Sequence, residues 1–99
     1  MIRHTVAFKL KHLPGSQAER DFLEAGGRLS AIPTVRNFEC LRQTGLKNPY
    51  AFGFSIEFAS QQDYQAYNDH PDHIRFVQTR WQVEVVDFIE IDYEPLASG

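Results

Sequence analysis

The sequence is poor in cysteine, since its 99 residues include Cys40 and no second one. A single cysteine excludes a disulfide within the chain and a zinc site built from several cysteine ligands. A reducing compartment suits this composition, so we expect a cytoplasmic protein.

Long apolar runs and excess positive charge are also missing. No run approaches the roughly 20 residues that span a membrane, and the first residues lack the apolar core of a signal peptide. Ten lysines and arginines stand against thirteen acidic residues, which gives a net charge of −3. Because nucleic-acid binding needs clustered positive charge, the sequence predicts neither a nucleic-acid nor a membrane partner.

The composition that remains is typical of one globular domain. Hydrophobic residues make up 42% of the chain and charged residues 23%, which argues against intrinsic disorder. We expect a single domain over residues 1–96, followed by a short tail over residues 97–99.

Two segments alternate between apolar and polar side chains with a period of two, which predicts strands over residues 2–11 and 50–59. His4 is the polar member of the apolar face of the first segment. Residues 35–42 predict an edge strand, and residues 82–93, rich in valine and isoleucine, predict the last strand. Four acidic residues near the end of the chain are expected to form a solvated face that protects the sheet edge: Asp87, Glu90, Asp92 and Glu94.

Helices are predicted where capping-box patterns precede apolar residues at helical spacing. One runs from about residue 16 to 31, and a second begins after Ser60, stops near Asp69 and restarts at Pro71. Gly26 and Gly27 lie inside the first helix. They indicate either close packing against the sheet, which we favour, or space left for a pocket.

The resulting order, β-α-β-β-α-β, predicts an α+β, ferredoxin-like sandwich. In this fold a four-stranded antiparallel sheet carries its helices on one face. The other face needs a partner, and a domain of this size buries a limited part of its surface alone. We therefore expect a homodimer in which two sheets pair into a dimeric α+β barrel.

A binding pocket between sheet and helices is the expected functional site. His4 and His73 can both face this space, with Tyr67 beside them. A neutral His73 suits a general base, Tyr67 can donate a hydrogen bond to a developing oxyanion, and His4 can orient the ligand. The alternative is that these side chains only pack in the core. The residues expected to bind the ligand around them are Phe52, Phe54, Trp81 and His70.

The segment His70-Pro71-Asp72-His73 also raises the question of a metal. Two histidines three residues apart can share a helix face, but Pro71 interrupts this helix and no second spaced pair exists. We therefore expect no metal site.

The sequence also lacks a Gly-rich phosphate loop and a Gly-x-Ser-x-Gly elbow, so phosphate binding and serine hydrolysis have no support.

Four segments resemble the stress-responsive A/B barrel domain (Dabb) family, and together they extend over nearly the whole chain. They are residues 3–11, 47–54, 64–73 and 89–94. The most specific is Tyr67-Asn68-Asp69-His70-Pro71-Asp72-His73, read as Tyr-x-x-His-Pro-x-His. The resemblance implies a dimeric ferredoxin-like barrel, and most members of the family have no assigned reaction.

The resemblance to one member of that family, a plant polyketide cyclase that forms olivetolic acid, implies a reaction. It implies catalytic roles for Tyr67 and His73 and a pocket role for His4, in an aldol-type ring closure without metal or organic cofactor. Phe52 and Ala25 depart from the cyclase, which has a histidine and a tyrosine at these places. The pocket is thus expected to be more apolar.

Three functions follow from these observations. The first is a Dabb protein of unassigned activity that binds a small apolar or carbonyl-containing molecule. The second is a cofactor-free, polyketide cyclase-like enzyme with His73 as base, and the third is a cofactor-independent monooxygenase. The enzymatic interpretation requires that His73 and Tyr67 reach one solvent-connected cavity.

Overall fold

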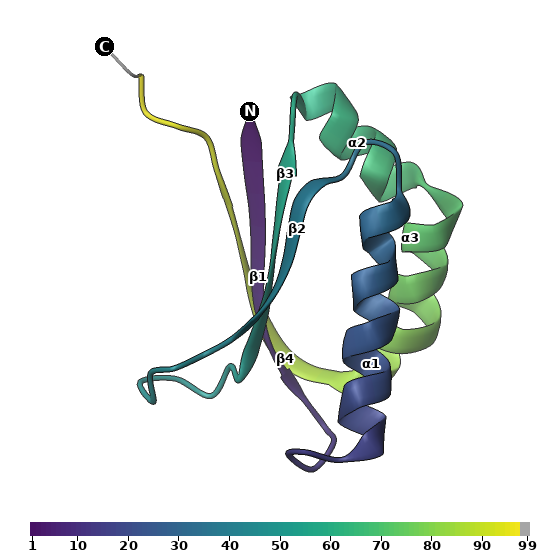
Figure 1. Cartoon of the computed structure of the whole chain (residues 1–99), viewed down its shortest axis with the longest axis vertical. Helices are drawn as coiled ribbons and strands as arrows, with labels where there is room; N and C mark the ends of the chain where they lie inside the picture. The colour runs from purple at the N-terminus through teal and green to yellow at the C-terminus, as the bar shows by residue number, and fades with distance from the viewer. Residues whose placement is uncertain (98–99) are drawn as a thin grey trace.

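The computed structural model describes residues 1–97, which form one sheet and a layer of helices (Figure 1). The elements follow in the order β1 (Ile2–Leu10), α1 (Gln17–Gly27), β2 (Arg36–Arg42), β3 (Phe52–Phe58), α2 (Gln61–Asp69), α3 (Pro71–Phe76), α4 (Gln82–Glu84) and β4 (Val85–Tyr93). The strands pair antiparallel in the order β2-β3-β1-β4, and the helices cover one face. The ferredoxin-like prediction is confirmed.

Capping residues set the helix boundaries much as the sequence predicts. The Ser16 hydroxyl accepts a hydrogen bond from the backbone N–H of Glu19 and caps α1. A 3₁₀ turn (Arg28–Ala31) then continues α1 to the expected end. Pro71 begins α3 after the break at His70, because its missing N–H costs nothing in the first turn.

The start of the last strand differs from the prediction, which put it at about Gln82. A π-helical turn (Val77–Trp81) continues the helical segment, and α4 (Gln82–Glu84) takes the place of the expected strand start, so β4 begins at Val85. The cause is the buried Glu84 carboxylate, which lies 2.7 Å from His12 Nε2 and accepts a 2.5 Å hydrogen bond from Arg80 Nε. These contacts keep Glu84 in the helix layer. In the expected tail, residues 98 and 99 lie outside the described residues.

Aromatic side chains make up much of the core between sheet and helices. Phe8 on β1 is fully buried, and its ring centroid lies 5.7 Å from that of Phe22 on α1. The same ring lies 4.8 Å from Phe54 and 5.1 Å from Trp81. Such tilted contacts add to the hydrophobic stabilisation of both layers.

The two adjacent glycines of α1 have different surroundings. A Cβ atom built on Gly26 would clash with Cζ of Phe54, whereas one built on Gly27 would meet nothing within 4 Å. Close packing against the sheet thus accounts for Gly26. It does not account for Gly27.

We expect Gly26→Ala to destabilise the protein by about 1–3 kcal/mol, because the added methyl group would push the Phe54 ring out of its contacts with Phe8 and Phe38. Gly27→Ala, its matched control, should be neutral or stabilise by up to about 1 kcal/mol through helix propensity. Urea unfolding followed by Trp81 fluorescence measures both variants. Equal effects would show that helix propensity, not packing, governs the pair.

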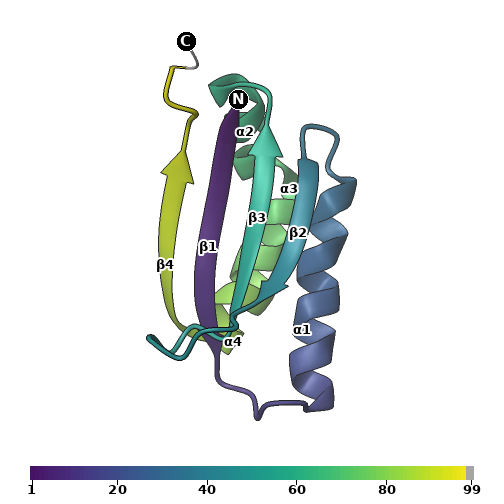
Figure 2. The same cartoon turned by 60° about the vertical axis from the view of Figure 1, so that its left-hand side comes forward.

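The face of the sheet opposite the helices is uncovered (Figure 2). Strand register places Leu41, Gly53, Ala7 and Ile89 in one row across this face. Ile91 follows in the next row, and both isoleucines are exposed. The small side chains of the central strands leave a flat apolar surface between the edge strands.

Within residues 1–97, no helix combines the length and apolar character that crossing a membrane requires.

Candidate functional site

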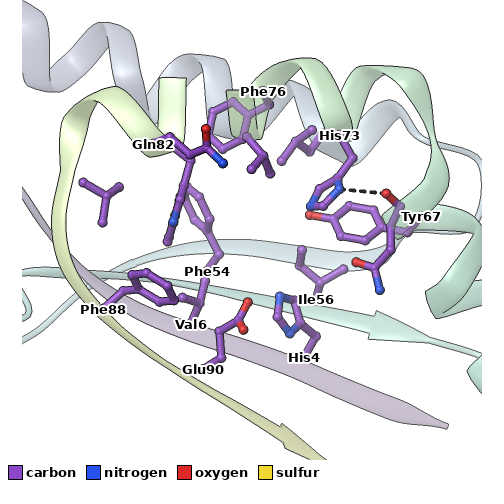
Figure 3. A pocket seen from close by; sticks show the side chains of 15 residues that line it. His4, Val6, Phe54, Ile56, Tyr67, His73, Phe76, Gln82, Phe88 and Glu90 are labelled. Carbon is purple, nitrogen blue, oxygen red and sulfur yellow. Dashed lines mark hydrogen bonds between the residues drawn. The ribbon is translucent and has the colours of Figure 1, made fainter. Parts of the chain in front are cut away.

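A cavity of about 520 Å³ lies between the inner face of the sheet and the helices α2 to α4 (Figure 3). This volume is in the range of small-molecule sites. Its lining residues are His4, Val6, Leu29, Phe54, Ile56, Tyr67, Asn68, His73, Phe76, Val77, Trp81, Gln82, Val85, Phe88 and Glu90. Gln82, Phe88 and Glu90 are exposed, so the cavity opens to solvent beside these three residues.

Strand register builds the floor of the cavity. Val6 on β1 pairs with Phe54 on β3 and with Glu90 on β4. One row along the sheet, His4 stands between Ile56 and Asp92. Alternate residues of each strand face the helices, so a mostly apolar floor carries a histidine and a carboxylate at defined places.

His73 and Tyr67 meet on the helical side of the cavity, with ring centroids 4.3 Å apart. The break between α2 and α3 brings His73 back over the last turn of α2. There its Nδ1–H donates a 3.2 Å hydrogen bond to the backbone carbonyl of Asn68. A carbonyl only accepts, so the neutral imidazole keeps its proton on Nδ1 and leaves the Nε2 lone pair free.

Burial shifts the titration of both side chains. Burial lowers the pKa of His73 below its ordinary value of 6.5, although the Asn68 carbonyl opposes part of this shift. Burial, together with the charge of Glu90, raises the pKa of Tyr67 well above its ordinary value. At neutral pH the site therefore offers an unprotonated imidazole and a protonated phenol.

A second hydrogen-bonded group holds His4 on the floor. His4 is 6% exposed, and its Nδ1 lies 2.6 Å from Oδ1 of Asp92. The Tyr64 hydroxyl donates to the other carboxylate oxygen over 2.9 Å, and the Tyr64 ring stacks on Phe58. A carboxylate that binds Nδ1–H fixes the ring orientation and leaves Nε2 as an acceptor.

Sequence analysis missed two acidic residues of this site. Glu90 and Asp92 were expected on a solvated face, but Glu90 lines the cavity and Asp92 binds His4. The alternation within β4 contains the information that would have found them. Because Ile89 and Ile91 share the outer face, the residues between and beyond them must point toward the helices.

The structure brings most of the expected site residues together. His4, Tyr67, His73, Phe54 and Trp81 all line the cavity.

The other two residues expected to bind the ligand are not among the lining residues. Phe52 packs against Phe8 and lies under the guanidinium of Arg42. His70 caps α3, since its Nδ1 accepts a 3.1 Å hydrogen bond from the backbone N–H of Asp72.

In the part of the chain that the structure describes, no three histidine, cysteine or acidic side chains come together in a group that could hold a metal ion.

These features define a ferredoxin-like α+β domain with an apolar cavity between its sheet and its helices. The chain belongs to the stress responsive A/B barrel domain (Dabb) family, whose domain it matches over residues 2–95. No protein with a curated description matches the sequence.

Solved structures support this assignment. The chain is 57% identical to a Dabb family protein with a ferredoxin-like fold from Mesorhizobium loti, with a TM-score of 0.94 and 97% of each chain covered. A dimeric ferredoxin-like protein of unknown function from Thermobifida fusca is 23% identical (TM-score 0.77; 93% of this chain and 88% of the other). A hydroxynitrile lyase from Passiflora edulis is 14% identical (TM-score 0.85; 99% and 95%). The last two likenesses concern the fold alone.

Proposed function

We propose that this Dabb protein binds a small, largely apolar carbonyl compound and moves a proton at the carbon next to the carbonyl, without a cofactor. The observation that carries the proposal is that the imidazole of His73 and the phenol of Tyr67 lie side by side on one open, apolar cavity. Side chains that served packing alone would not require that open space.

The roles follow from the protonation states. Nε2 of His73 takes the proton as the C–H bond breaks, and the electron pair of that bond moves toward the carbonyl oxygen. The Tyr67 hydroxyl donates a hydrogen bond to this oxygen, where negative charge develops. His4, held by Asp92, orients the ligand from the opposite wall. In a cyclase-like reaction, the resulting enolate carbon would attack a second carbonyl of the same molecule.

The chemistry can be tested before the natural ligand is known, with 4-methylacetophenone as a neutral probe. We expect the protein to accelerate exchange of the acetyl protons for deuterium in D₂O, measured by proton NMR against buffer alone. Calorimetry should show one binding site per chain. Binding without exchange would reduce the proposal to a binding protein, and absence of both would refute it.

We further propose that two copies of the chain associate through the uncovered sheet face. Leu41, Ile89, Ile91 and Tyr93 expose large apolar side chains there, and an apolar surface of this kind is typical of an interface. The Thermobifida fusca protein of the same fold is described as dimeric, which supports this assembly.

A cytoplasmic location stays a prediction from the single cysteine.

A further inference from the structure

Glu90 gives the cavity its charge. Glu90 is the one acidic residue among the described residues that line the cavity, and no lysine or arginine is among them. Figure 3 shows this carboxylate pointing from β4 into the cavity, between His4 and Phe88. A ligand therefore meets a negatively charged group with no lysine or arginine in the described lining to offset it.

The Glu90 carboxylate also lacks a partner in the part of the chain that is described. Two other acidic residues of the sheet have partners. Glu57 pairs with Arg3 over 2.9 Å, and Asp92 pairs with His4 over 2.6 Å. No ion pair or hydrogen bond of this kind involves Glu90. Its capacity to accept hydrogen bonds is thus available to a bound molecule.

The charge of Glu90 acts on the two groups proposed to carry the chemistry. It adds to the burial that raises the pKa of Tyr67, and it opposes the burial that lowers the pKa of His73. A negative charge at this range also disfavours the negative charge of an enolate. A group that neutralises Glu90 would therefore make proton removal easier in this cavity.

We propose that the ligand is a carbonyl compound that also carries a protonated amine, and that Glu90 selects for this amine. The inference rests on the proposed function. An ammonium group beside the carboxylate forms a charge-assisted hydrogen bond and removes the repulsion that a developing enolate would meet. A carbonyl compound that carries a carboxylate or phosphate meets repulsion from Glu90 instead, so the cavity disfavours it.

Three probes of similar size and one shared carbonyl group test this selection: 4-(aminomethyl)acetophenone, 4-methylacetophenone and 4-acetylbenzoate. Calorimetry at low ionic strength gives their dissociation constants. In the natural protein we expect the cation to bind about tenfold more tightly than the anion, with the neutral probe between them. Glu90→Gln keeps the shape of the side chain and should bring the three constants to within about twofold of one another.

Glu24→Gln is the matched control, because Glu24 is an exposed glutamate on α1 and does not line the cavity. This variant should keep the tenfold preference. Loss of the preference in Glu24→Gln, or its survival in Glu90→Gln, would overturn the role of Glu90. Binding of all three probes without preference would overturn this inference alone. If no probe bound, the proposed function would fail with it.

Discussion

Replacing His73 by asparagine is expected to slow the exchange of carbonyl-adjacent protons by about 10²- to 10⁴-fold, the usual contribution of a positioned general base. Asparagine suits the test because its amide N–H can replace Nδ1–H as donor to the Asn68 carbonyl. It offers no nitrogen lone pair in place of Nε2. NMR measures the rate with 4-methylacetophenone, and calorimetry checks that binding of the probe persists.

Tyr67→Phe is the companion variant, since it removes the hydroxyl and keeps the ring against His73. We expect a smaller loss than for His73→Asn, because the base remains while one hydrogen bond to the oxyanion is lost. If His73→Asn kept its exchange activity while Tyr67→Phe lost it, the assignment of the base would be wrong.

The acid limb of the pH–rate profile should also identify His73. Burial lowers its pKa, so the imidazole stays unprotonated further into acid than an exposed histidine does. The rate should therefore hold as the pH falls to the ordinary value of 6.5 and decline only below it. The same depression implies that its contribution to stability is present above 6.5 and is lost as the pH falls through the lowered pKa. An acid limb above 6.5 would contradict the burial argument.

The sequence predicted the sheet well because local alternation determines which side chains of a strand are buried. Val6 and Phe8 on β1 needed no long-range information to be placed on the inner face. Residues 82–84 were different. Val83 suits a strand, but Glu84 is held in the helix layer by His12, which lies 72 residues away in the chain. A contact of that separation is not visible in a local pattern.

For the site, too, the sequence predicted the local contacts and missed the long-range ones. Tyr67 and His73 lie within one short motif, so their proximity follows from the local chain path. The pairing of His4 with Asp92 joins residues 88 positions apart and depends on how β1 and β4 are aligned. A shift of one residue in that alignment would turn Glu90 and Asp92 away from the cavity. Register, rather than residue type, gives these two carboxylates their roles.

Replacing Ile89 by aspartate is expected to convert the proposed dimer into a monomer. Ile89 lies in the central apolar row of the uncovered face, and it is 48% exposed in the single chain. A carboxylate buried there without a partner would weaken association by about 3 kcal/mol or more, which is over 100-fold in the dissociation constant. Sedimentation equilibrium should then give the chain mass of 11.4 kDa in place of twice that value.

Ile74→Asp provides the matched control, because Ile74 is 43% exposed but lies on α3, on the opposite side of the molecule. Ile74→Asp should remain dimeric, and a dimeric Ile89→Asp would refute the proposed interface.

The Ile89→Asp variant also tests whether ligand binding depends on dimerisation. The cavity lies on the other face of the sheet from Ile89. A folded Ile89→Asp monomer should therefore still bind 4-methylacetophenone, because the substitution does not touch the cavity lining.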